Sequence, residues 1–153
     1  KAQLAICNQL IDELGVDERI IYRGALKDEA LRQHYQQARI FLMTSRWEGM
    51  PLVIGEAMAM GLPIVSMWNT GSAEYLQDGQ YGVLTPAKNV PALVDQLIPL
   101  LMDRKLREDY AQRARKRSHD FMMPRILRQW LSLLNRQYLP QIVLTIDEQR
   151  RPG

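Results

Sequence analysis

The sequence predicts an α/β fold, a Rossmann-like parallel sheet with helices on both faces. Short apolar runs alternate along the chain with segments whose apolar residues recur at helical spacing, and this βαβα order is typical of parallel sheets. With 153 residues, the chain is long enough for one domain with a sizeable core. Its 46% hydrophobic and 24% charged residues match a soluble globular protein rather than a disordered one.

The first elements are a helix, a strand, a helix and a strand. Residues 4–14 have helical apolar spacing, and Cys7 on the apolar side is interpreted as a small buried hydrophobe. The β-branched and aromatic residues 20–22 predict a short strand. Residues 40–43 predict a buried parallel strand. Between them Asp28 can cap a helix whose apolar side has three residues: Leu31, Tyr35 and Ala38.

The later elements continue the alternation. A helix begins near Pro51, where a missing N–H costs nothing, and ends at Gly61. Asn89 caps a helix through about residue 102, which Pro99 is expected to kink or end, and Asp103 starts another. The remaining segments are strands at 63–67 and 82–85, a short helix at 71–76 with a turn at 77–80, and a last helix at 124–138.

The ends and the bulk properties restrict the interpretation further. We expect residues 1–138 to form one domain and residues 139–153 a tail, whose apolar stretch 142–144 is either a strand added to a partner or, as we favour, a frayed end. No apolar run approaches the roughly 18–20 residues of a membrane span, and no secretory signal is present, so we expect a cytoplasmic location. One cysteine, two histidines and no Asp-x-Asp pair predict no metal site and no disulfide.

Basic residues gather late in a chain of net charge +3. Such a cluster can attract anionic lipid or nucleic acid, or it can be a solvated helix face. The interleaved Glu108 and Asp109 favour the solvated face, and the lack of interleaved aromatic residues argues against nucleic acid. Peripheral contact with an anionic membrane stays open as an alternative. The cluster consists of Arg104, Lys105, Arg107, Arg113, Arg115, Lys116 and Arg117.

Two carboxylates, Glu48 and Glu56, flank the point where a loop enters the helix that begins near Pro51. In open α/β sheets, ligands bind where strands lead into helix N-termini, and free N–H groups there favour an anion such as a diphosphate. Gly49 would let the main chain approach the ligand closely. Glu56, a little over one turn into the helix, can accept two hydrogen bonds from a vicinal diol such as a ribose. Taken singly, each carboxylate would more often be an ordinary surface charge.

The whole segment 45–65 is similar to a known family signature. It reads S-x-x-E-G-M-P-x-x-x-x-E-A-M-A-x-G-x-P-I-V and resembles the retaining GT-B glycosyltransferases of family 4, or group 1 transferases. Flanking segments resemble the same family: R-I-I-Y-R-G at 19–24, Y-Q-Q-A-R-I-F-L at 35–42, T-G-S-A-E at 70–74 and G-x-x-G-V-L at 79–84. The resemblance covers roughly residues 4–120 and implies the C-terminal half of a GT-B architecture.

The resemblance implies a role for each matched residue. Glu56 would accept hydrogen bonds from the donor's ribose, and Glu48 would lie near the sugar hydroxyls, either as a nucleophile or as an orienting group. Thr70 replaces the first of the family's paired glycines, which reduces main-chain freedom at a turn that Gly71 would bring near the sugar. The sugar and diphosphate would be held by Gly49, Met50, Pro51, Leu52 and Val53, and the nucleobase would lie near Arg23, Gly24 and Leu26.

The implied function is sugar transfer with retention from a nucleotide-diphosphate-sugar donor to an acceptor, in bacterial surface polysaccharide biosynthesis, without a cofactor. The family's N-terminal acceptor domain and the basic pair that neutralises the diphosphate are missing, so we expect the isolated chain to be inactive. The alternative is a non-catalytic nucleotide- or sugar-binding module of the same fold. A phosphorylase or an epimerase on this architecture is disfavoured by the two carboxylates at this spacing.

Overall fold

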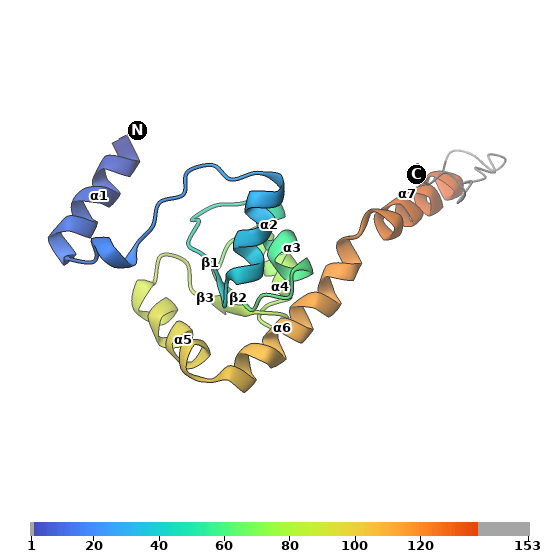
Figure 1. The fold of residues 1–153 in the computed structure, drawn as a ribbon. Helices are drawn as coiled ribbons and strands as arrows, with labels where there is room; N and C mark the ends of the chain where they lie inside the picture. The colour runs from blue at the N-terminus through green and yellow to red at the C-terminus, as the bar shows by residue number, and fades with distance from the viewer. Residues whose placement is uncertain (1, 138–153) are drawn as a thin grey trace. The chain divides into compact units, whose positions relative to one another are not determined.

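The computed structural model describes residues 2–137, which divide into two compact units on either side of the His34–Tyr35 bond, and each unit is treated by itself. Figure 1 shows the succession of helices and strands along the chain. The first unit contains helix α1 (Ala2–Leu14), the 3-10 turn η1 (Asp17–Arg19) and most of α2 (Asp28–Gln37). The second contains the last residues of α2 and all that follows.

Two expectations for the first unit are wrong. Residues 20–22 are exposed and form no strand, because a strand needs a neighbouring strand to receive its hydrogen bonds and none among the described residues pairs with this segment. Cys7 is exposed rather than buried, since the apolar side of α1, including Leu4 and Leu14, is itself exposed. The helical spacing of the sequence therefore predicted the helix correctly but not its burial.

The sheet is parallel, as predicted, with strand order β1-β2-β3. Its strands are β1 (Phe41–Met43), β2 (Ile64–Met67) and β3 (Val83–Thr85). Val65 of β2 is paired with Leu42 on one side and with Val83 on the other. All four residues of β2 are buried, whereas Leu42 on β1 is exposed. The central strand is thus the one that most fully matches the buried apolar run expected of a parallel sheet.

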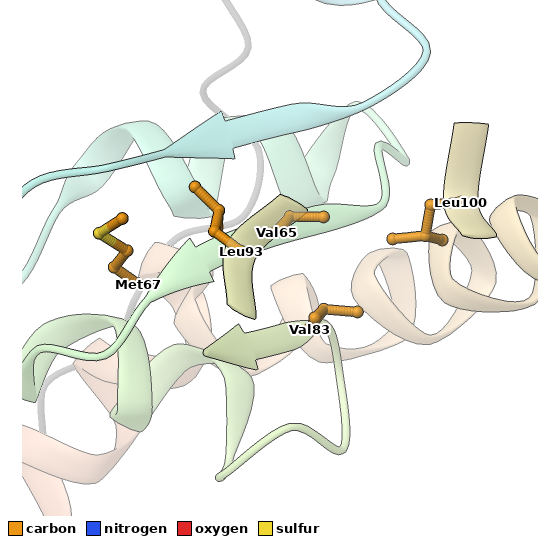
Figure 2. Close-up of a cluster of buried hydrophobic side chains, with 5 residues drawn as sticks. All are labelled: Val65, Met67, Val83, Leu93 and Leu100. Atoms are coloured by element: carbon orange, nitrogen blue, oxygen red, sulfur yellow. The ribbon is translucent and has the colours of Figure 1, made fainter. Parts of the chain in front are cut away.

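Helices cover both faces of the sheet, as predicted. On one face, Val65 and Met67 of β2 form a core cluster with Val83 of β3 and with Leu93 and Leu100 of α5 (Val90–Met102), as Figure 2 shows. The other face is covered by α3 (Leu52–Ala59) and α4 (Thr70–Leu76). There Ser66 Oγ of β2 lies 2.9 Å from Ser72 Oγ of α4. Alternate residues of one strand therefore tie two helical layers to the sheet.

Helix α5 continues through Pro99 to Met102, the end expected from the sequence, so Pro99 does not end the helix. A proline inside a helix costs about 3 kcal/mol, and the next residue, Leu100, is fully buried in the core cluster with β2 and β3. The caps are as predicted: Asn89 Oδ1 accepts from the Ala92 amide, and Asp103 Oδ1 accepts from the Leu106 amide at the start of α6 (Arg104–Ser118). Side-chain caps therefore set the beginnings of both helices.

Three arginines of α6 each cap the C-terminal end of a different helix. Arg107 donates to the carbonyls of Leu100 and Leu101 in α5 at 2.7 and 2.8 Å. Arg115 donates to Met60 O at the end of α3, and Arg117 donates to Glu74 O and Tyr75 O in α4. A cation at a helix C-terminus satisfies unpaired carbonyls and complements the helix dipole. Part of the basic cluster is therefore structural, a role that neither the solvated-face nor the membrane interpretation included.

The chain continues through η2 (His119–Phe121) into α7 (Met123–Gln137). The apolar side predicted for this last helix is largely exposed at Leu127, Trp130 and Leu134. The predicted tail, with its apolar stretch 142–144, lies outside the described residues. Within residues 2–137, no helix combines the length and the apolar character required to cross a membrane.

Candidate functional site

The N-terminus of α3 has no side-chain cap. Pro51 occupies the N-cap position in an extended conformation, and the first intrahelical bond runs from the Ile54 amide to Pro51 O at 3.1 Å. Among the described residues, the main-chain amides of Leu52 and Val53 make no hydrogen bond, and the side chains of both residues are exposed. By contrast, α4, α5 and α6 are each capped by an Asn or Asp side chain. The first turn of α3 can therefore donate hydrogen bonds to an anion.

The loop that joins β1 to α3 is attached to the beginning of α4. The Gly71 amide donates to Glu48 O at 3.1 Å, and Asn69 Nδ2 donates to Ser45 O at 3.3 Å. Asn69 is only 3% exposed, and its Oδ1 also accepts from the Ser72 amide at 2.8 Å, which caps α4. One buried side chain thus holds both the loop and the helix behind it.

Gly71 has no room for a side chain. A Cβ atom at this position would lie 2.4 Å from Pro51 Cδ and 2.6 Å from Gly49 O, both closer than real contacts allow. The structure therefore brings Gly71 together with Gly49 and Pro51, three residues that the sequence placed in one site. The preceding Thr70 begins α4 without a positive φ, so replacing the family's first paired glycine causes no strain there.

Glu56 lies on the exposed side of α3 and has one hydrogen-bond partner among the described residues. Tyr35 Oη donates to Glu56 Oε2 at 3.0 Å. Tyr35 is 8% exposed, and the centre of its ring lies 6.1 Å from the centre of the Phe41 ring on β1. Burial first, and then the hydrogen bond to Glu56 and its negative charge, raise the pKa of Tyr35 to about 12. Tyr35 therefore remains a hydrogen-bond donor throughout the neutral pH range.

Glu56 also lines a hollow of about 310 Å³. The buried Tyr75 packs against Gly55 there, since a Cβ on Gly55 would lie 3.1 Å from Tyr75 Oη. The centres of the Tyr75 and Phe121 rings are 4.4 Å apart. Burial, followed by the charges of Glu74 and Glu56, raises the pKa of Tyr75. The hollow is lined by Leu52, Gly55, Glu56, Ala59, Tyr75, Ser118, Phe121 and Met122.

The other predicted site residues, Arg23, Gly24 and Leu26, belong to the first unit. Gly24 has a φ of +65°, which favours glycine. Their contribution to a nucleobase site stays a prediction. Within residues 2–137, no group of three or more His, Cys, Asp or Glu side chains is arranged to hold a metal ion.

Sequence reasoning missed three residues of the site: Tyr35, Asn69 and Tyr75. Tyr35 was assigned only to the apolar side of a helix, although a buried tyrosine usually finds a partner for its hydroxyl. Asn69 precedes a short predicted helix, where asparagine is a preferred N-cap, and this signal could have identified it. Nothing in the local sequence around Tyr75 indicates that it lies beside Glu56.

Comparison with known proteins gives related enzymes. The chain is 33% identical over 106 residues to the amylovoran biosynthesis glycosyltransferase AmsD of Erwinia amylovora. The aligned region covers 69% of this chain and 30% of AmsD. The chain is 29% identical over 123 residues to the N-acetyl-alpha-D-glucosaminyl L-malate synthase of Bacillus anthracis, covering 80% of this chain and 32% of that protein. The chain thus spans about a third of the length of these relatives.

Solved structures share the fold. Sucrose-phosphate synthase from Thermosynechococcus elongatus matches with a TM-score of 0.78 at 23% identity, over 91% of this chain and 35% of that one. The C-terminal domain of the group 1 glycosyl transferase LpcC from Francisella tularensis matches with a TM-score of 0.67 at 26% identity, over 76% of this chain and 60% of that one. The family model of glycosyl transferases group 1 matches residues 3–117. The chain belongs to this family, with the GT-B type of α/β fold that its sequence predicted.

Proposed function

We propose that this chain is the donor-binding part of a retaining family 4 glycosyltransferase that uses a nucleotide-diphosphate-sugar. The observation that carries the proposal is the uncapped N-terminus of α3, which lies between Glu48 on the loop ahead and Glu56 one turn behind. A diphosphate needs hydrogen-bond donors and positive potential, both of which a helix N-terminus supplies. The two carboxylates then lie on either side of the diphosphate, where they can accept hydrogen bonds from the hydroxyl groups of the ribose and of the sugar.

In this proposal, Glu56 accepts hydrogen bonds from the ribose, and Glu48 lies at the sugar end. The bond between the anomeric carbon and the diphosphate breaks, a new bond to the acceptor oxygen forms on the same face of the sugar, and the acceptor's proton passes to the leaving phosphate. Glu48 orients the sugar hydroxyls for this step. The family's other mechanism, in which the carboxylate is a nucleophile, makes a different prediction for the isosteric amide.

The proposed domain comprises residues 1–138, and the acceptor-binding part would come from outside this chain. In support, the matched Francisella structure is itself described as a C-terminal domain, and the chain spans about a third of AmsD and of the Bacillus anthracis synthase. A transferase site between two domains is incomplete with one of them, so the 153-residue chain alone should bind nucleotide without transferring sugar. The relatives AmsD, an amylovoran biosynthesis glycosyltransferase, and VipC/TviE, a Vi polysaccharide biosynthesis protein of Salmonella typhi, support bacterial polysaccharide biosynthesis as the setting.

Calorimetric titration with UDP and GDP tests donor binding. We expect one of the two to bind the chain, and we expect Glu56→Ala to weaken that binding by about 10-fold or more, because charge-assisted hydrogen bonds contribute about 1.5–3 kcal/mol each. Glu108→Ala is the matched control, since this glutamate lies in an exposed pair with Arg104. Equal binding by the wild type and Glu56→Ala would contradict the proposed site.

A measurement of sugar transfer by the protein that includes its acceptor-binding part distinguishes a transferase from a non-catalytic binding module. Glu48→Gln keeps the hydrogen-bonding capacity of the side chain but removes the nucleophile. If Glu48 only orients the sugar, the variant should retain measurable transfer. If Glu48 is the nucleophile, the variant should transfer no sugar, and the wild type should form a detectable glycosyl-enzyme. Nucleotide binding without any transfer in the wild type would favour the binding module.

A further inference from the structure

We propose that Tyr35 is a positioning residue that sets the orientation of the Glu56 carboxylate and thereby gives the site its preference for a ribonucleotide over a 2′-deoxyribonucleotide. The proposal rests on the proposed function, in which Glu56 receives the ribose. Tyr35 itself would not touch the donor. It would orient the Glu56 carboxylate, which binds the donor's ribose.

The contact joins a rigid group to a mobile one. Tyr35 is buried beside Phe41 on β1, whereas Glu56 is exposed on α3. An exposed glutamate samples many rotamers, and holding it in one of them costs conformational entropy when a ligand binds. The 3.0 Å hydrogen bond from Tyr35 Oη to Glu56 Oε2 holds one carboxylate oxygen in place before any ligand is present. The carboxylate is therefore preorganised rather than ordered by the ligand.

The remaining acceptor capacity fits a vicinal diol. An ionised carboxylate offers about four lone-pair positions on its two oxygens. Tyr35 occupies one of them on Oε2. The others remain for two donors, which is the number that the 2′- and 3′-hydroxyls of a ribose provide. A carboxylate that rotates freely can still receive one hydroxyl, but it receives two only in a restricted range of orientations.

The Tyr35 hydroxyl has no other hydrogen bond among the described residues, so its only observed interaction is with Glu56. The aromatic ring accounts for the packing against Phe41, and phenylalanine would fill the same space. Removing the hydroxyl therefore separates positioning from packing. Because burial and Glu56 together keep this hydroxyl protonated, it acts as a donor and never competes with the diol as an anion.

The test compares affinities for UDP and 2′-deoxy-UDP, and for the corresponding guanine pair, by calorimetry on the 153-residue chain. In the wild type, we expect the ribonucleotide to bind more tightly. Tyr35→Phe should reduce this ratio by about 3- to 10-fold, because the freed carboxylate receives both hydroxyls in only part of its orientations, while the affinity for the 2′-deoxynucleotide stays nearly the same. Tyr110→Phe, which changes a partly buried tyrosine of α6 in the core, is the matched control and should leave the ratio unchanged.

The outcomes separate this proposal from the one on which it rests. If Glu56→Ala leaves nucleotide binding unchanged, the proposed function fails. If Glu56→Ala weakens binding but Tyr35→Phe keeps the wild-type ratio, only the positioning role is overturned. Equal weakening of ribo- and deoxyribonucleotide by Tyr35→Phe would show a merely structural role. A double-mutant cycle of Tyr35→Phe with Glu56→Gln provides a second measurement, and additive effects on the ratio would also contradict the proposal.

Discussion

The main-chain amide of Gly71 donates a 3.1 Å hydrogen bond to the main-chain carbonyl of Glu48, which attaches the first carboxylate's loop to the start of α4. The contact is possible because residue 71 has no side chain. Any Cβ there would collide with Pro51 and with the carbonyl of Gly49. Gly71 therefore determines where the loop lies and where α3 begins.

Gly71→Ala should displace this loop. The added methyl group would meet atoms of Gly49 and Pro51 at 2.6 and 2.4 Å, and overpacking of this kind costs about 1–3 kcal/mol. We expect a lower melting temperature and, through the displaced α3 N-terminus, nucleotide binding weakened by about 10-fold or more. Gly49→Ala is the control for stability, since nothing lies within 4 Å of a Cβ at that position. Equal melting temperatures for the two variants would contradict the packing role of Gly71.

Asn69→Ala and Asn89→Ala form a matched pair of cap removals. Each asparagine accepts from the amide three residues later, at 2.8 Å for Asn69 and 3.0 Å for Asn89, so each substitution should lower the free energy of unfolding by about 0.5–2 kcal/mol. Only Asn69 also donates to Ser45 O in the loop ahead of α3. Calorimetry should therefore show weaker nucleotide binding for Asn69→Ala alone, and the same affinity for both variants would mean that this second bond does not hold the site.

Arg117→Met should destabilise the second unit by about 2–3 kcal/mol. Its guanidinium donates to Glu74 O and Tyr75 O, pairs with Asp120 at 2.7 Å and lies 4.7 Å from the centre of the Phe121 ring. Arg104→Met is the control, because its pair with Glu108 is exposed and such surface pairs contribute little to stability. Denaturant unfolding measures both, and a small loss for Arg117→Met would show that water replaces it at the end of α4.

The hydroxyl of Tyr35 makes stability depend on alkaline pH. Its pKa rises from 10.0 to about 12 in the folded chain, so the neutral form is favoured by folding. This contribution is complete below about pH 10 and is lost as the pH rises through about 12, with an upper limit of about 2–3 kcal/mol. Tyr35→Phe should therefore lose less stability than the wild type on going from about pH 9 to about pH 11. Parallel pH dependence in the two proteins, measured by denaturant unfolding, would rule out this effect.

The sequence predicted the elements of the second unit well because each has a local signal. Pro51 and Gly61 bound α3, Asn89 and Asp103 cap the helices that follow them, and the apolar run 64–67 matches a central strand. The strand predicted at residues 20–22 does not form, because β propensity alone does not make a strand without a neighbouring strand to pair with. Pro99 lies inside α5 rather than at its end, and no local rule describes the burial of the neighbouring Leu100.

The roles of the site residues stay predictions. Glu48, Glu56 and Gly71 were selected from their spacing and from a family resemblance, and the structure brings Gly71 onto the Glu48 loop. The pairing of Tyr35 with Glu56 joins two helices that are 21 residues apart in sequence. Such a contact depends on how the helices pack, so neither periodicity nor capping rules could predict it.

Three arginines of α6 bind main-chain carbonyls at the ends of α3, α4 and α5, and a main-chain carbonyl is the same whatever side chain the residue bears. Substitutions at the ends of these three helices therefore leave the attachment points in place. A protein built in this way can vary its surface and its ligand-facing residues independently of the bonds that hold its helices together. Substitution of an exposed residue at one of these helix ends leaves the capping bond in place, whereas substitution of Arg107, Arg115 or Arg117 removes it.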